Sequence, residues 1–248
     1  MLIGSSSCTH LSPISWKTLT NKFKLSITVL SAITLLIISW AGWDLFNNTS
    51  NYGWVSLGIW AILTIPGSIP LPHLGIIVTI GDYLLMSIAV IYGISPCVVV
   101  TVFFAFAVLV VMRGTPIFIQ IFNFCTLVCN SFLFSIAFLF SAQSYSFYMN
   151  YMILPVLIMS LVSFLFSISL IAIMLACTRN NKIFRLWVKK SPLLIINHIV
   201  SAVGVILAIL IEMQLNSPFA ILLVFPIILF NWAWTRQFAQ GIEREIST

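Results

Sequence analysis

The chain has 248 residues, of which 61 % are apolar and 6 % are charged, and its mean hydropathy is +1.14. A soluble domain carries about 25 % charged residues to cover its surface, so this composition excludes a soluble enzyme and a disordered segment. The net charge of +6 does not indicate a nucleic-acid partner, because the basic residues lie between apolar segments and form no stripe. The composition predicts an all-α, polytopic transmembrane helical bundle with the lipid bilayer as its main partner.

The apolar segments, taken in chain order, predict eight transmembrane spans. A helical span needs roughly 17–25 mostly apolar residues. The segments end at proline-rich or glycine-rich stretches, such as residues 66–72, where three prolines cannot continue a helix. The second segment is short, so it either crosses at a tilt or re-enters the membrane. The eight expected spans are residues 25–43, 52–65, 74–93, 97–112, 117–140, 151–177, 192–211 and 218–234.

The distribution of charge gives an independent test of this count. With eight spans and a cytoplasmic N-terminus, all 11 basic residues fall on the same side of the membrane. This agrees with the positive-inside rule. We therefore expect a cytoplasmic segment at residues 1–24, a membrane domain at 25–235 and a cytoplasmic tail at 236–248. The expected location is the inner cell membrane, with the chain crossing it several times.

Asp82 is the most informative single residue, because it lies inside an apolar segment next to Gly81. An ionisable side chain at membrane depth is costly unless it is paired or faces water, which makes Asp82 a candidate ligand-binding or proton-carrying residue. The structural alternative is that Asp82 lies in the first turn of a helix starting near Thr79 and caps its free N–H groups. Arg113 either pairs with Asp82 or anchors its span by reaching the headgroups.

Other polar residues of the membrane domain are candidates for a ligand pocket. Asn123 and Asn130 are seven residues apart and share a helix face, and His198 lies inside a later span. Hydrogen bonding between helices is the structural alternative for all three residues. Cys125 and Cys129 also share a face, but two ligands are too few for a metal site. No metal or other cofactor is expected.

The sequence contains no catalytic motif, so we expect a protein that is not an enzyme. The loop at residues 178–190 mixes basic and apolar residues. It predicts either a short interfacial helix on anionic lipid or a docking site for a cytoplasmic partner. The residues expected to face such a partner are Arg113, Arg179, Lys182, Arg185, Lys189 and Lys190.

Short motifs between residues 65 and 134 resemble a known membrane domain. They read PGSIPLP at 66–72, IGD at 80–82, YGISP at 92–96, Arg113, and FN at 122–123. In this order they are similar to the multi-span N-terminal membrane domain found ahead of bacterial HD or HD-GYP phosphohydrolase and GGDEF cyclase domains. The Gly-Asp and Gly-x-x-Pro pairs are also similar to substrate-binding components of energy-coupling-factor vitamin transporters. The chain departs from both groups at residues 102–106, which are wholly apolar where an acidic residue is usual.

The resemblance implies a sensing or binding module that takes a small molecule between its helices and signals to a cytoplasmic protein. Gly81, Asp82, Asn123, Asn130 and His198 are then the ligand-binding candidates. The alternative is a substrate-binding or permease subunit of a vitamin-type transporter, which would recruit an ATPase module. A membrane enzyme acting on lipids is a third hypothesis, but it lacks a recognisable set of catalytic residues.

Overall fold

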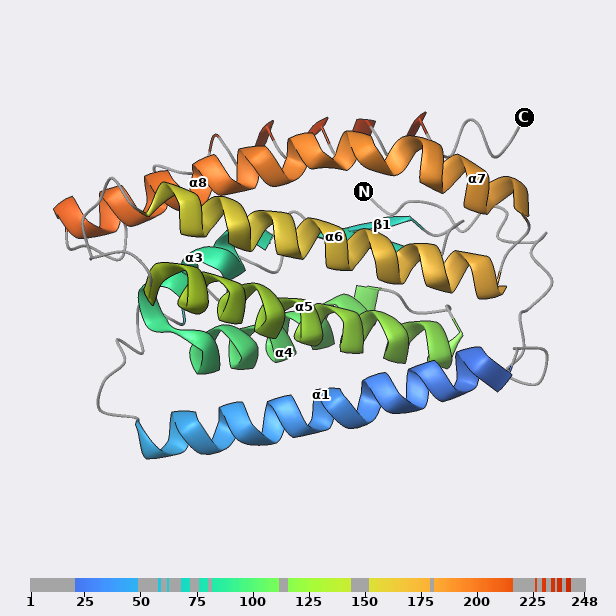
Figure 1. Cartoon of the computed structure of the whole chain (residues 1–248), viewed down its shortest axis with the longest axis horizontal. Helices are drawn as coiled ribbons and strands as arrows, with labels where there is room; N and C mark the ends of the chain where they lie inside the picture. Colours follow the sequence, from blue (N-terminus) through green and yellow to red (C-terminus); the bar gives the residue numbers. More distant parts are fainter. Residues whose placement is uncertain are drawn as a thin grey trace.

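The computed structural model describes residues 21–48, 68–71, 76–79, 82–111, 116–143, 152–178 and 181–215, together with isolated positions between 58 and 241. This part is a bundle of helices with one short hairpin (Figure 1). The bundle confirms the predicted helical architecture, and the hairpin adds two strands to it. The elements are α1 (Asn21–Asn47), β1 (Ser68–Leu71), β2 (Ile76–Thr79), α3 (Asp82–Tyr92), α4 (Ile94–Val111), α5 (Ile117–Gln143), α6 (Ile153–Thr178), α7 (Asn181–Lys190), a 3-10 turn (Ser191–Leu194) and α8 (Ile195–Leu215).

Prolines mark the starts of four helical segments. Pro96 and Pro155 lie in the first turns of α4 and α6, and Pro192 begins the 3-10 turn before α8. Pro116 directly precedes α5, and its carbonyl accepts hydrogen bonds from the backbone N–H groups of Ile119 and Gln120. Proline is tolerated at these places because the first backbone N–H groups of a helix have no intrahelical acceptor. The breaks expected from the sequence therefore lie at helix starts.

The helices pack side by side, with α1 parallel to α5 and α6 antiparallel to both. Figure 1 shows α1 along one side of the bundle and α8 along the other, with α4, α5 and α6 between them. One buried cluster joins Phe23 at the start of α1, Phe118 at the start of α5, Leu175 near the end of α6 and Trp187 of α7. These four segments therefore share one end of the bundle, which we call the basic end because Lys24 and the basic residues of α7 lie there.

Residues 74–93 do not form the single helical span that the sequence predicts. Ile76–Thr79 is a strand that pairs antiparallel with Ser68–Leu71, and the helix begins only at Asp82. Besides its threonine, β2 consists of two isoleucines and one valine, and β-branched side chains favour a strand over a helix. Pro70 is compatible with β1 because each strand of a two-stranded sheet has a free edge.

Four helices are long and apolar enough to span a membrane: Phe23–Asn47, Ile117–Gln143, Ile153–Ala176 and Trp187–Ile211. The helices α3 and α4 are apolar but shorter. The expected second and eighth spans fall almost entirely outside the described residues, as do residues 1–20. The described part thus supports a membrane protein with at least four apolar helices of spanning length.

Exposed apolar side chains follow these helices over a common length. On α1 they run from Leu25 to Phe46, and on α5 from Ile117 to Phe140. At 1.5 Å per residue these stretches measure about 31 and 35 Å, close to the roughly 30 Å of a bilayer hydrocarbon core. An apolar surface of this extent would be unstable in water and is suited to lipid contact.

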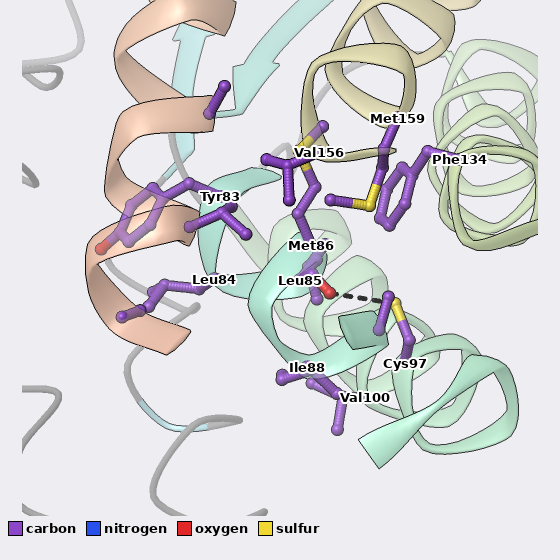
Figure 2. Close-up of a cluster of buried hydrophobic side chains, with 14 of the residues drawn as sticks. Tyr83, Leu84, Leu85, Met86, Ile88, Cys97, Val100, Phe134, Val156 and Met159 are labelled. Atoms are coloured by element: carbon purple, nitrogen blue, oxygen red, sulfur yellow. Dashed lines mark hydrogen bonds between the residues drawn. The ribbon is translucent and has the colours of Figure 1, made fainter. Parts of the chain in front are cut away.

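The opposite end of the bundle has its own core around α3. Tyr83, Leu84 and Met86 are buried there against residues of α4, α5, α6 and α8 (Figure 2). The thiol of Cys97, in α4, donates a hydrogen bond to the Leu85 carbonyl of α3 over 3.2 Å. Gly93 links α3 to α4 with a positive φ of 96°, a conformation that favours glycine.

Candidate functional site

A row of buried polar side chains crosses the apolar bundle from α5 through α6 to α8. The Asn130 side-chain N–H donates to Ser163 Oγ over 2.9 Å. One turn earlier on α6, the Ser160 hydroxyl donates to the backbone carbonyl of His198 over 2.8 Å. We call Asn130, Ser160, Ser163 and His198 the polar seam. All four residues are buried, so the seam places two separate hydrogen bonds on successive turns of α6, one to α5 and one to α8.

Two atoms of the polar seam have no hydrogen-bond partner among the described residues. They are Asn130 Oδ1 and His198 Nδ1, on side chains that are 4 % and 9 % exposed. A buried polar atom without a partner costs about 1–3 kcal/mol, and most such atoms in folded proteins have one. The seam therefore has spare hydrogen-bonding capacity at two points, one on each side of α6, which a small polar molecule or a water molecule would satisfy.

The imidazole of His198 is held by an aromatic contact. Its ring meets the Phe164 ring edge-on, with centroids 5.2 Å apart and an interplanar angle of 67°. Phe164 follows Ser163 directly on α6, so the same turn of α6 contacts both Asn130 and His198. This arrangement fixes the orientation of the histidine ring relative to the asparagine side chain.

The remaining ligand-binding candidates are not among the four residues that define the seam. Asp82 is the first residue of α3 and is buried, which matches the expected position in the first turn of a helix. Asn123 is buried on α5, and its seven-residue separation from Asn130 places it about 10 Å along the helix axis toward the basic end. Gly81, Arg113 and Arg179 lie outside the described residues, so the proposed Asp82–Arg113 pair has no structural description.

The basic candidates on α7 take up different positions. Arg185 and Lys189 are exposed, whereas Lys190 is half-buried. Lys182 is helical, and the structure describes its backbone only. The loop at residues 178–190 is therefore largely a helix.

Sequence reasoning missed the two serines of the seam. Ser160 and Ser163 are three residues apart on one face of an otherwise apolar helix, and Ser167 continues that face. Small polar residues at this spacing are typical of contacts between membrane helices, so the signal was present in the sequence. The sequence does not indicate which helices Ser160 and Ser163 contact.

The two cysteines expected on one face of α5 do share a face, and that face packs against α1. Ser31 Oγ lies 3.6 Å from Cys125 Sγ, and Thr34 Oγ1 lies 3.4 Å from Cys129 Sγ. Both cysteines are free thiols. Among the described side chains, no group of three His, Cys, Asp or Glu residues is placed to hold a metal ion.

The motifs that carry the family resemblance fall on several elements of the described structure. The PGSIPLP stretch contains β1, Asp82 begins α3, Gly93 joins α3 to α4, and Asn123 lies on α5. The residues that follow Asp82 are buried in the α3 core, whereas Phe122 is buried in the cluster at the basic end. Comparison of the chain with protein-family models, curated proteins and solved structures gives no match.

Proposed function

We propose that this chain is a multi-pass membrane protein that binds a small polar molecule at the polar seam, as a sensing or binding module. The observation that carries the proposal is the pair of unpartnered atoms, Asn130 Oδ1 on α5 and His198 Nδ1 on α8, with α6 packed against both helices. In an apolar bundle each buried polar group needs a partner, and the described residues supply none for these two atoms. The seam is not built for catalysis in this proposal.

The two unpartnered atoms also indicate the chemistry of the ligand. An amide oxygen accepts a hydrogen bond, and an imidazole nitrogen accepts or donates one according to its tautomer. A molecule that satisfies both atoms must carry at least one donor and a second polar group, and a hydroxyl serves either atom because it both donates and accepts. The apolar surroundings of the seam favour a molecule that also has an apolar body.

We further propose that the basic end of the bundle faces the cytoplasm. Lys24 and the basic residues of α7 lie at this end, and Asp44 lies at the other. Positive charge collects on the cytoplasmic side of membrane proteins, so α1 would leave the cytoplasm and α6 would return to it. Eight spans, an inner-membrane location and two cytoplasmic termini remain part of this proposal.

A transporter subunit is the second candidate function, and the interrupted segment from β1 to α3 favours it. The helix α3 has 11 residues and measures about 16 Å, or half a bilayer. It follows a strand hairpin within an apolar stretch and is separated from α4 by Gly93. Discontinuous elements of this kind often surround the substrate site of transporters.

Native mass spectrometry of the intact protein in mild detergent tests both functions. We expect a retained small molecule in the wild type that is lost in Asn130→Leu and in His198→Phe. Ser141→Ala is the matched control, because the Ser141 hydroxyl bonds only to carbonyls of its own helix. An ATPase chain in the complex would favour the transporter subunit, and a cytoplasmic signalling protein would favour the sensor.

Stability measured without ligand separates a binding seam from a structural one. His198→Phe removes an unpartnered nitrogen and keeps an aromatic ring beside Phe164, so the empty protein should gain thermal stability or stay unchanged. A large loss of stability in His198→Phe, with the same retained molecules as the wild type, would contradict the proposed function.

A further inference from the structure

The helix α7 presents a mixed basic and apolar face to its surroundings. Arg185, Val188 and Lys189 are exposed, and their spacing of three and four residues places them on one face. Trp187, on another face, is only 1 % exposed and packs into the buried cluster at the basic end. The tryptophan thus fixes α7 to the bundle and leaves the Arg185–Lys189 face exposed.

This exposed face changes from basic to apolar within one helical turn. Leu193 and Ile196 follow Lys189 along the same direction, and both are exposed. On α1 the same change occurs between Lys24 and the strongly exposed Leu25. Since the starts of α1 and α7 share the basic end, the two changes mark one level, which corresponds to the boundary between headgroups and acyl chains.

The charge at this level has a single sign among the described side chains. Lys24, Arg185, Lys189 and Lys190 are basic. The two acidic residues whose side chains are described lie elsewhere: Asp44 is in the last turn of α1, and Asp82 begins α3 beside the opposite core. The level therefore attracts anions, and those available at a bilayer boundary are lipid phosphates.

We propose that the Arg185–Lys189 face of α7 binds the headgroups of anionic phospholipids, with Val188 and Leu193 resting on the upper acyl chains. The alternation of basic and apolar side chains on one exposed face suits a lipid boundary better than it suits a soluble protein or a nucleic acid. This inference does not depend on the polar seam, because none of its residues belongs to the seam.

The full-length protein in nanodiscs tests this inference. Discs containing phosphatidylcholine and phosphatidylglycerol are extracted with mild detergent, and the retained lipids are counted by native mass spectrometry. We expect the wild type to enrich phosphatidylglycerol, and the enrichment to fall roughly fivefold for each basic residue removed in Arg185→Gln and Lys189→Gln. The enrichment should also fall as salt is raised from 50 to 500 mM.

The matched control is the variant carrying Arg185→Lys and Lys189→Arg, which keeps both charges and should keep the enrichment. The thermal midpoint in pure phosphatidylcholine discs should be equal in all variants, since both positions are exposed. Unchanged enrichment in the glutamine variants would overturn the inference. Competition by inorganic phosphate at millimolar concentration would instead show a free-phosphate site, and capture of a cytoplasmic protein through the same two residues would show a protein interface.

Discussion

The carboxylate of Asp44, in the last turn of α1, accepts a hydrogen bond from the hydroxyl of Ser95 in the first turn of α4. The Asn48 side chain donates to the same carboxylate over 3.0 Å. A negative charge at the start of α4 also complements the helix dipole there. Asp44 directly follows the expected first span at residues 25–43, and the structure makes it a link between two helices.

We predict that Asp44 and Ser95 are energetically coupled. Ser95→Ala should lower the free energy of unfolding by about 1.5–3 kcal/mol, because it removes a hydrogen bond to a charged group. Asp44→Asn should lower it less, since an amide oxygen still accepts the bond. The variant that carries both substitutions should lose less unfolding free energy than the two single losses added together. Unfolding in detergent measures all three losses. Additive single effects would mean that the two side chains do not interact.

The two glycines Gly93 and Gly42 should respond in opposite directions to alanine. A β-carbon would meet no atom within 4 Å at either position, so steric clashes are not involved. Gly93 has a positive φ, so Gly93→Ala should lower the free energy of unfolding by about 1–2 kcal/mol. Gly42 lies inside α1, so Gly42→Ala should raise the free energy of unfolding by about 0.5–1 kcal/mol. Thermal midpoints of the two variants measure both effects, and a stable Gly93→Ala would disprove the role assigned to the α3–α4 link.

Within the polar seam, the Asn130–Ser163 bond should contribute more than an ordinary serine contact. Ser163→Ala leaves the Asn130 N–H without its acceptor in an apolar bundle, and we expect a loss of about 1 kcal/mol. Ser141→Ala removes only a bond to its own helix and should be nearly neutral. The two variants are compared by their unfolding midpoints in the same detergent. Equal effects would indicate that the seam gives no stability of its own.

Trp187 should stabilise the basic end through its volume and not through its indole N–H. Trp187 is buried beside Phe23 and Leu194, and its Nε1 has no partner among the described residues. Trp187→Phe should therefore cost less than about 1.5 kcal/mol. Trp187→Ala should cost about 3–5 kcal/mol, because it leaves a large cavity. The measurement is thermal unfolding, and a severe defect in Trp187→Phe would point to a hydrogen bond through the indole.

Composition and proline positions predicted much of the bundle, because long apolar segments have few alternatives to a helix. The starts of α5 and α6, near Pro116 and Pro155, agree with the expected spans to within two residues. The strand Ile76–Thr79 was not predicted, since periodicity alone does not distinguish a short apolar strand from a helix. Its pairing with β1 depends on a contact across the proline-rich turn, which no local pattern indicates.

The candidate site was predicted in part. Asn130 and His198 were recognised because amide and imidazole groups are rare at membrane depth. Ser160 and Ser163 were not, since serine is common in apolar helices and its role depends on the neighbouring helix. Asp82 was expected in the first turn of a helix and lies there.

The uninterrupted backbone from α7 through the 3-10 turn into α8 has a mechanical consequence. Lys190 and Ile195, on either side of the turn, both keep right-handed helical dihedral angles, and Figure 1 shows the two helices as one run along the bundle. His198 is eight residues from Lys190, about 12 Å along this run. A rotation of α8 at His198 is therefore coupled to Arg185 and Lys189 through a continuous helical backbone, and the 3-10 turn at Pro192 is the point where that backbone can bend.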